Sequence, residues 1–84
     1  MGGITAKVLF FGQLREIVGC GEDTFALTDG AAVGGIFAYY AERFPRLGEF
    51  RGVVVASRNR EFVDWETAVR AGDEVAFLPP VSGG

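Results

Sequence analysis

One long apolar stripe limits the folds that this chain can adopt more than any other feature of the sequence. Its members recur at the three- and four-residue spacing of a single helix face: Val33, Ile36, Phe37, Tyr40, Ala41 and Phe44. Pro45 follows directly and ends the helix. At the other end Gly34 and Gly35 each disfavour helix by up to about 1 kcal/mol, and only Thr28 or Asp29 offers a capping side chain. We therefore expect a helix that is firm from Ile36 onward.

Short segments with a two-residue period surround this helix and predict strands. We expect strands over residues 4–11, 24–28, 53–57 and 61–63, and a last strand within "VRAGDEVAFL" after a turn at Gly72-Asp73. The inward-facing side chains are predicted to be Ile4, Ala6, Val8, Phe10, Phe25, Leu27, Val75 and Phe77, with partial burial of Leu9 and Phe11.

The connections carry weaker signals. "GQLREIVG", residues 12–19, predicts a short turn of helix, and "GCGED" predicts a turn. "PRLGEFRG", residues 45–52, predicts an irregular connection with Leu47 and Phe50 tucked into the core.

This order of elements restricts the topology. One amphipathic helix covers one face of a mixed sheet of about four or five strands, and the first and last strands, as the most apolar, are expected side by side in its middle. The prediction is an α+β fold of the β-grasp, or ubiquitin-like, type, with a domain over residues 1–78 and a flexible, extended tail over 79–84. A chain of 84 residues is expected to form a single domain. A domain of this size buries only about 60 to 65% of its unfolded surface, so it needs the apolar residues that it has.

Composition excludes several classes of function. The chain has no histidine and one cysteine, so it lacks a Ser-His-Asp triad, a Cys-His pair and an ordinary zinc site, and Ser57 and Ser82 have no base to activate them. Net charge is −3 and Lys7 is the only lysine, which argues against nucleic acid as a partner. No apolar run is long enough to span a membrane, and "MGGITAK" lacks the pattern of a signal peptide. We expect a cytoplasmic protein that is not itself a catalyst and binds no cofactor or metal.

Other candidate sites have plainer explanations. Cys20 lies between two glycines in an expected turn, with no clustered base to activate it. The glycine pair before the helix matches no phosphate-binding motif. The acids Glu61, Asp64 and Glu66 fit a solvated edge better than a metal site, and Trp65 suits either the core or an interface.

The end of the sequence, "PPVSGG", is the strongest candidate for function. Pro79 and Pro80 end the strand ladder and favour an extended course, and six extended residues reach roughly 20 Å. Gly83 and Gly84 have no side chain, so the terminal carboxylate fits a channel too narrow for other residues. A frayed end or cloning remnant is the alternative, but the two prolines, Val81 as an apolar anchor and the glycine end together favour an arm that carries the reactive group.

Two segments, "KVLFFGQLREIVG" at residues 7–19 and "GDEVAFLPPVSGG" at residues 72–84, closely resemble the small, sulfur-carrier subunits of molybdopterin synthase, which are ubiquitin-like sulfur carriers. The helix follows the family's pattern more loosely, with Ala32 where a Ser or Thr cap is usual. Leu78 replaces a frequent aromatic residue, and "MGG" at the start matches nothing in the family and is either a natural extension or a cloning remnant.

The resemblance implies a defined chemistry and set of partners. A ubiquitin-activator-like adenylyltransferase uses ATP and magnesium to convert the terminal carboxylate into an acyl-adenylate. A cysteine desulfurase or rhodanese-type donor then supplies the sulfur of a C-terminal thiocarboxylate. The tail enters the large catalytic subunit of molybdopterin synthase, in a heterotetramer of two small and two large subunits, and gives its sulfur to cyclic pyranopterin monophosphate.

By the same resemblance, Gly84 bears the sulfur and Gly83 is the slim approach to it. The tail residues expected to contact partners are Leu78, Pro79, Pro80, Val81 and Ser82, while Phe77 faces the core and Glu74 meets either solvent or a basic partner residue. Two alternatives stay open: a sulfur carrier for thiamine thiazole, cysteine or tRNA thiolation, and a ubiquitin-like modifier of lysines.

Overall fold

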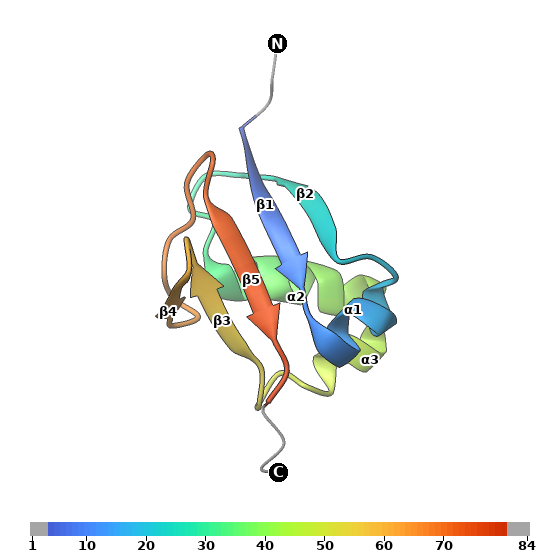
Figure 1. Ribbon diagram of the computed structural model, residues 1–84. Coiled ribbons are helices and arrows are strands. Elements are labelled where there is room, and N and C mark those ends of the chain that lie inside the picture. The colour runs from blue at the N-terminus through green and yellow to red at the C-terminus, as the bar shows by residue number, and fades with distance from the viewer. Residues whose placement is uncertain (1–3, 81–84) are drawn as a thin grey trace.

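The structure is a computed structural model that describes residues 4–80 (Figure 1). Its elements follow the chain as β1 (Thr5–Phe10), α1 (Gly12–Val18), β2 (Glu22–Ala26), α2 (Val33–Arg43), α3 (Pro45–Gly48), β3 (Val55–Arg58), β4 (Glu61–Val63) and β5 (Glu74–Leu78).

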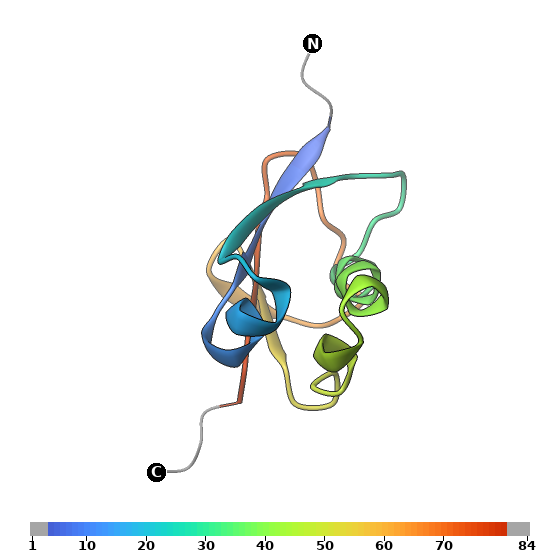
Figure 2. The same ribbon diagram turned by 90° about the vertical axis from the view of Figure 1, so that its right-hand side faces the viewer.

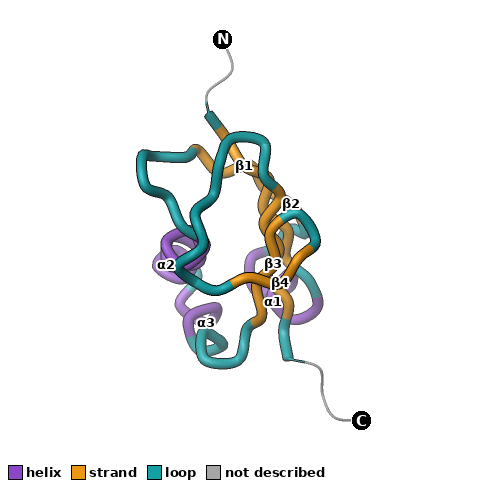
Figure 3. The backbone as a smooth tube through the Cα atoms, turned by 90° about the vertical axis from the view of Figure 1, so that its left-hand side faces the viewer, coloured by secondary structure: helices purple, strands orange, loops and turns teal. Residues whose placement is uncertain are grey.

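The five strands form one mixed sheet in the order β2-β1-β5-β3-β4. The first and last strands of the chain, β1 and β5, pair in parallel inside the sheet, from Lys7 opposite Glu74 to Phe10 opposite Phe77. The other neighbours are antiparallel. Helices α2 and α3 lie together on one side of the sheet (Figures 2 and 3). The predicted β-grasp fold, with its central pair of terminal strands, is confirmed.

The core lies between the sheet and the helices. Ala6, Val8 and Phe10 of β1 are buried, as the alternation predicts. Phe77 of β5 is also fully buried, with its ring 5.2 Å from that of Phe37 on α2. The prediction for Ile4 is wrong: it precedes β1 and is 65% exposed, because the helices do not extend to that end of the strand.

The first connection is more regular than expected. The short turn predicted after β1 is a seven-residue helix, α1, which ends at Gly19 in the left-handed conformation with φ 91°. Strand β2 then begins at Glu22 and ends at Ala26, two residues earlier than the predicted range of 24–28. Phe25 and Leu27 pack against the core, as expected.

Helix α2 begins at Val33, three residues before the predicted firm start at Ile36. Its N-cap residue, Ala32, has no capping side chain. The backbone of the segment after β4 replaces the cap, because the amides of Val33 and Gly34 donate to the carbonyl oxygens of Thr67 and Trp65 at 2.9 and 2.8 Å. Neither Thr28 nor Asp29 is the N-cap, and the first turn is held by a distant part of the chain.

The predicted irregular connection after α2 contains the short helix α3, with Pro45 at its start. Leu47 is fully buried and Phe50 packs against the core, as predicted. Trp65 belongs to the core edge: its ring lies 5.2 Å from that of Phe37, and the Arg51 guanidinium lies 5.3 Å above it.

Strand β3 begins at Val55 rather than Val53 and ends at Arg58, and β4 occupies the predicted edge position. A polar clamp joins their turn to the start of β5. The side-chain amide of Asn59, whose φ is 52°, donates to Asp73 at 3.0 Å and accepts from the Glu74 amide at 2.9 Å. Asp73 also accepts from the Arg70 backbone amide at 2.8 Å.

The two glycines of α2 give a matched test of the backbone cap. A Cβ added to Gly34 would lie 3.1 Å from the Trp65 carbonyl oxygen, whereas one added to Gly35 meets nothing within 4 Å. Gly35→Ala should therefore stabilise the fold by up to about 1 kcal/mol. Gly34→Ala should lose that gain, because the carbonyl cannot retreat without lengthening its bond to the Gly34 amide. Urea unfolding of both variants checks this, and equal stabilisation would contradict the assigned cap.

The Asp73 clamp predicts a pH dependence. Hydrogen bonds from the Arg70 backbone amide, and then from Asn59, lower the pKa of the Asp73 carboxyl. The stability from this lowered pKa is fully present above about pH 4, the ordinary range of an unfolded aspartate, and is lost as pH falls through the folded value. Asp73→Asn should reduce the difference in unfolding free energy between pH 7 and pH 3. Asp64→Asn, which removes one negative charge outside the clamp, is the control, and an equal effect of both variants would refute this role.

Candidate functional site

The predicted tail leaves the sheet at the end of β5. Leu78, the last residue of that strand, pairs with Val55, and the carbonyl oxygen of Phe77 accepts the Phe11 amide at 3.2 Å. Pro79 has no amide hydrogen, so it cannot extend the ladder. Phe77 faces the core as predicted, Leu78 and Pro79 are half-buried, and Pro80 is exposed.

Pro79 packs directly on Gly12, the first residue of α1. Gly12 has φ +55°, and a Cβ at this position would lie only 2.8 Å from the Pro79 Cγ. A side chain at residue 12 would therefore displace the proline ring that sets the direction in which the chain leaves β5. This contact was not predicted, although the glycine directly after the first predicted strand is a signal for it.

The other predicted tail residues, Val81, Ser82, Gly83 and Gly84, lie outside the described residues, as does the "MGG" segment. Their roles, and the boundary placed after residue 78, stay predictions. The structure describes the base of the tail, where Pro79 packs on Gly12 and Leu78 shares a groove with Phe11.

An apolar groove lies next to this base, on the sheet face opposite α2 and α3. Its members come from four strands or their ends: Leu9, Phe11, Ser57, Arg60, Phe62, Glu74, Ala76 and Leu78. Phe62 is 76% exposed and Phe11 44%, and within residues 4–80 no helix covers this face. Exposed aromatic side chains around a groove are typical of a protein-binding surface.

Phe11 is exposed rather than partly buried as predicted, and Phe62 is not among the predicted site residues. Both residues could have been found from the sequence, because they are apolar residues on the strand face that points away from the core. A sheet with one solvent-exposed face normally carries polar residues there. Leu78, which was predicted to contact partners, is the residue shared by this groove and the tail.

Charges are sparse and paired around this groove. Arg60 has φ 72°, and its Nε lies 3.9 Å from a carboxylate oxygen of Glu74. The Arg60 side chain is 90% exposed, so the pair contributes little to stability. Glu74 begins β5, at the end of that strand remote from the tail.

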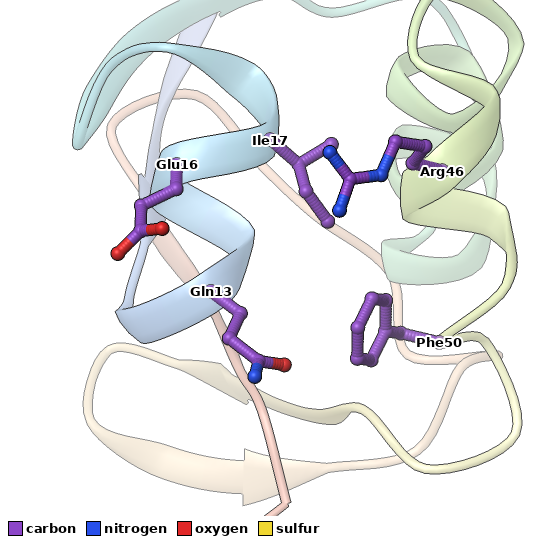
Figure 4. Close-up of a pocket in the computed structure, with 5 residues that line it drawn as sticks. All are labelled: Gln13, Glu16, Ile17, Arg46 and Phe50. Carbon is purple, nitrogen blue, oxygen red and sulfur yellow. The ribbon is translucent and has the colours of Figure 1, made fainter.

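The remaining candidates form no reactive centre. Cys20 is exposed. Within the described chain, no group of three or more Asp, Glu or Cys residues is arranged to hold a metal ion. A pocket between α1 and α3 is lined by Gln13, Glu16, Ile17, Arg46 and Phe50. In Figure 4, Ile17 and Phe50 point into it and the Glu16 carboxylate points away from Arg46, so it holds no nucleophile paired with a base.

No helix among residues 4–80 is both long and apolar enough to cross a membrane.

Comparison with known proteins identifies the family. Residues 8–84 match the model of the ThiS family. The molybdopterin synthase sulfur carrier subunit of Chlamydomonas reinhardtii is 40% identical over 80 residues, covering 93% of this chain and 96% of that protein. Among solved structures, the small archaeal modifier protein 1 of H. volcanii superposes with a TM-score of 0.79 and 26% identity, covering 94% of this chain and 100% of that one.

A further solved structure is a protein–protein complex of subunits 1 and 2 of molybdopterin-converting factor from Helicobacter pylori 26695. It matches with a TM-score of 0.65 and 25% identity, covering 95% of this chain and 99% of the matched chain. The chain therefore belongs to the ThiS family, and within it to the sulfur carrier subunits of molybdopterin synthase that its two end segments resemble.

Proposed function

We propose that this chain is the sulfur carrier of a molybdopterin synthase and that Gly84 carries the sulfur as a C-terminal thiocarboxylate. The observation that supports the proposal is the packing of Pro79 on Gly12 at the end of β5, next to an exposed apolar groove. Membership of the family supplies the chemistry.

The reactive step needs an activating enzyme because a carboxylate is a poor electrophile. In the proposed sequence, the Gly84 carboxylate attacks ATP, with magnesium held by the adenylyltransferase, and forms an acyl-adenylate with release of pyrophosphate. The terminal sulfur of a persulfide on a desulfurase or rhodanese-type donor displaces AMP and forms an acyl disulfide. A second thiol then cleaves the S–S bond, which leaves the thiocarboxylate on Gly84 and a disulfide on the thiol side. The thiocarboxylate then gives its sulfur to cyclic pyranopterin monophosphate in the large subunit.

Catalysis is assigned to the partners, and the composition of the chain supports this division. It contains no histidine, its one thiol at Cys20 is exposed, and Ser57 is only 8% exposed. Gly83 and Gly84 need only pass through a narrow channel, for which the lack of a side chain suits them. The preceding part of the tail is proposed to lie along the groove of the partner that leads to this channel: Pro79, Pro80, Val81 and Ser82.

The apolar groove is the proposed docking surface for the large subunit. A complex between two subunits of molybdopterin-converting factor in a structural relative supports a partner of this kind. Phe62, Phe11 and Leu78 offer aromatic and aliphatic anchors of the kind that dominate interfaces. Because one tail must visit the adenylyltransferase and the large subunit in turn, both are proposed to use this surface, with two small and two large subunits in the synthase.

Resemblance to the small archaeal modifier protein favours one second candidate, a modifier of lysines. The two functions use the same acyl-adenylate and differ in the nucleophile that receives the acyl group. A tagged chain expressed in cells separates them: a modifier gives lysine-linked conjugates by mass spectrometry, whereas a dedicated carrier gives only the free thiocarboxylate.

Docking can be tested with two exposed apolar residues. Phe62→Ser should weaken binding to the large subunit by at least about tenfold, or about 1.4 kcal/mol, since burial of such a ring contributes about 1.5 to 3 kcal/mol. Ile4→Ser is the matched control, because Ile4 is 65% exposed but lies outside the groove. Titration calorimetry measures both, and unchanged binding of Phe62→Ser would reject the groove as the docking surface.

The chemical role of Gly84 can be tested by intact mass. Incubation with the activating enzyme, ATP, magnesium and a sulfur donor should add the mass difference between sulfur and oxygen. Deleting Gly84 should abolish this gain, because the carboxylate then falls about 3.3 Å short of its position, while deleting Gly2 should not. The proposed chemistry is wrong if the chain without Gly84 still supports cofactor synthesis.

A further inference from the structure

The edge of the sheet at β4 has an unpaired side next to the apolar groove. Within residues 4–80, β4 is the last strand of the sheet and pairs with β3 alone. Figure 3 looks onto this edge and shows the chain turning toward α2 after β4, where the Trp65 carbonyl accepts the Gly34 amide at 2.8 Å. An unpaired strand edge is a template for one more strand.

The backbone of Phe62 points outward from this edge. Asn59 and Arg60 form the two-residue turn between β3 and β4, both with positive φ, at 52° and 72°. The pair that closes such a hairpin is the hydrogen-bonded one, here Arg58 with Glu61. Because bonded and non-bonded pairs alternate along an antiparallel ladder, the next residue, Phe62, has its amide and carbonyl directed away from β3.

Three side chains along this edge lie on the uncovered face of the sheet. Phe62 is 76% exposed and lines the apolar groove together with Arg60. Val63 and Trp65 both pack against the core. Asp64, which lies between them, therefore points to the opposite face, the face of Phe62. The edge thus presents a cation, an aromatic ring and an anion in sequence, each two residues from the next.

This order of charges is complementary to itself about Phe62. If a second copy pairs antiparallel with β4 so that Phe62 faces its own counterpart, a two-fold axis perpendicular to the sheet relates the two chains. Arg60 and Asp64 are each two residues from that axis, so Arg60 of either copy lies opposite Asp64 of the other. Directly opposite residues share a face, so both unlike pairs lie on the same face as the two Phe62 rings.

The other charges near this edge do not oppose such pairing. Glu61 lies on the core side of β4, opposite Arg58 of the same chain, and its counterpart in the second copy would be only a diagonal neighbour. Glu74 lies 3.9 Å from the Nε of Arg60, whose side chain is 90% exposed and so can also reach a second copy. Glu66 follows β4 in the turn toward α2.

We propose that two copies of this chain associate reversibly through β4, in an antiparallel pair that continues the sheet. The Phe62 amide of each copy donates to the Phe62 carbonyl of the other, and the two rings pack together on the uncovered face. Arg60–Asp64 pairs between the copies flank the rings and fix the register. A strand of three residues gives a small interface, so the association is weak and needs a high concentration of the chain.

Self-association has a consequence for docking, and this consequence alone rests on the proposed function. The pair covers Phe62, so a paired carrier cannot offer that ring to the large subunit. Strand β3 separates β4 from β5, and the base of the tail at Pro79 stays outside the pair. Self-association and binding of the large subunit therefore compete for Phe62.

Charge reversal gives the direct test, with the full-length chain alone. Arg60→Asp places two anions on the edge and Asp64→Arg two cations, so each variant repels itself. Each should self-associate at least about tenfold more weakly than the unaltered chain in sedimentation velocity. Mixed one to one, the variants carry unlike charges at both positions and should associate again. Asp29→Arg makes the same change of charge as Asp64→Arg away from this edge and is the control.

A second measurement identifies the edge that pairs. In the isotope-labelled chain, the amide signal of Phe62 should shift as the concentration rises, and that of Thr24, on the opposite edge strand, should not. The proposal is overturned if the unaltered chain stays monomeric at millimolar concentration, if the mixed variants stay monomeric, or if Thr24 shifts in place of Phe62. No activating enzyme or large subunit is present, so any of these results leaves the proposed sulfur transfer intact.

Discussion

Parallel pairing of β1 with β5 organises the molecule. The register that sets Val8 opposite Val75 and Phe10 opposite Phe77 puts the two most buried strands side by side and forces the intervening chain to cross one face of the sheet. The crossing segment contains α2, whose aromatic side chains pack against the sheet and complete the core. It also brings the end of β5 to the end of β1, where α1 begins, so that Pro79 meets Gly12. The position of Pro79 against Gly12 is thus a consequence of the central strand pair.

The same constraint leaves one face of the sheet uncovered by helices among the described residues. With α2 and α3 on one side, the opposite face remains open around Phe62 and Leu78, adjacent to the base of the tail. Strand β2, at one end of the sheet, pairs with no second strand among the described residues. In the proposed function, the terminus carries the reactive group and the uncovered face of the sheet positions it.

Local patterns predicted the features that depend on nearby residues. The apolar stripe of α2, the alternation of β1 and β5, and the burial of Leu47 all follow from short-range spacing, and the fold follows from their order. Short-range spacing did not predict where α2 starts, because the helix is capped by the carbonyls of Trp65 and Thr67, some thirty residues away. Ile4 was misplaced because alternation says which face a side chain takes but not where the helices covering that face stop.

The functional features also divide into those that local sequence predicts and those that depend on long-range contacts. The role of the tail and its glycines is a prediction from residue types and from the resemblance of the two end segments. The contact of Pro79 with Gly12 and the groove around Phe62 depend on segments brought together only by the fold. An apolar residue on the second face of a strand is a weak signal until the sheet is known to have one uncovered side.

The most direct measurement is the formation of molybdopterin when the chain, as its Gly84 thiocarboxylate, is added to a molybdopterin synthase large subunit with cyclic pyranopterin monophosphate and no other sulfur source. The account predicts that molybdopterin forms in a single turnover as the thiocarboxylate returns to carboxylate, with two carriers consumed for each dithiolene. A thiocarboxylate that stays intact, with no molybdopterin formed, would contradict it.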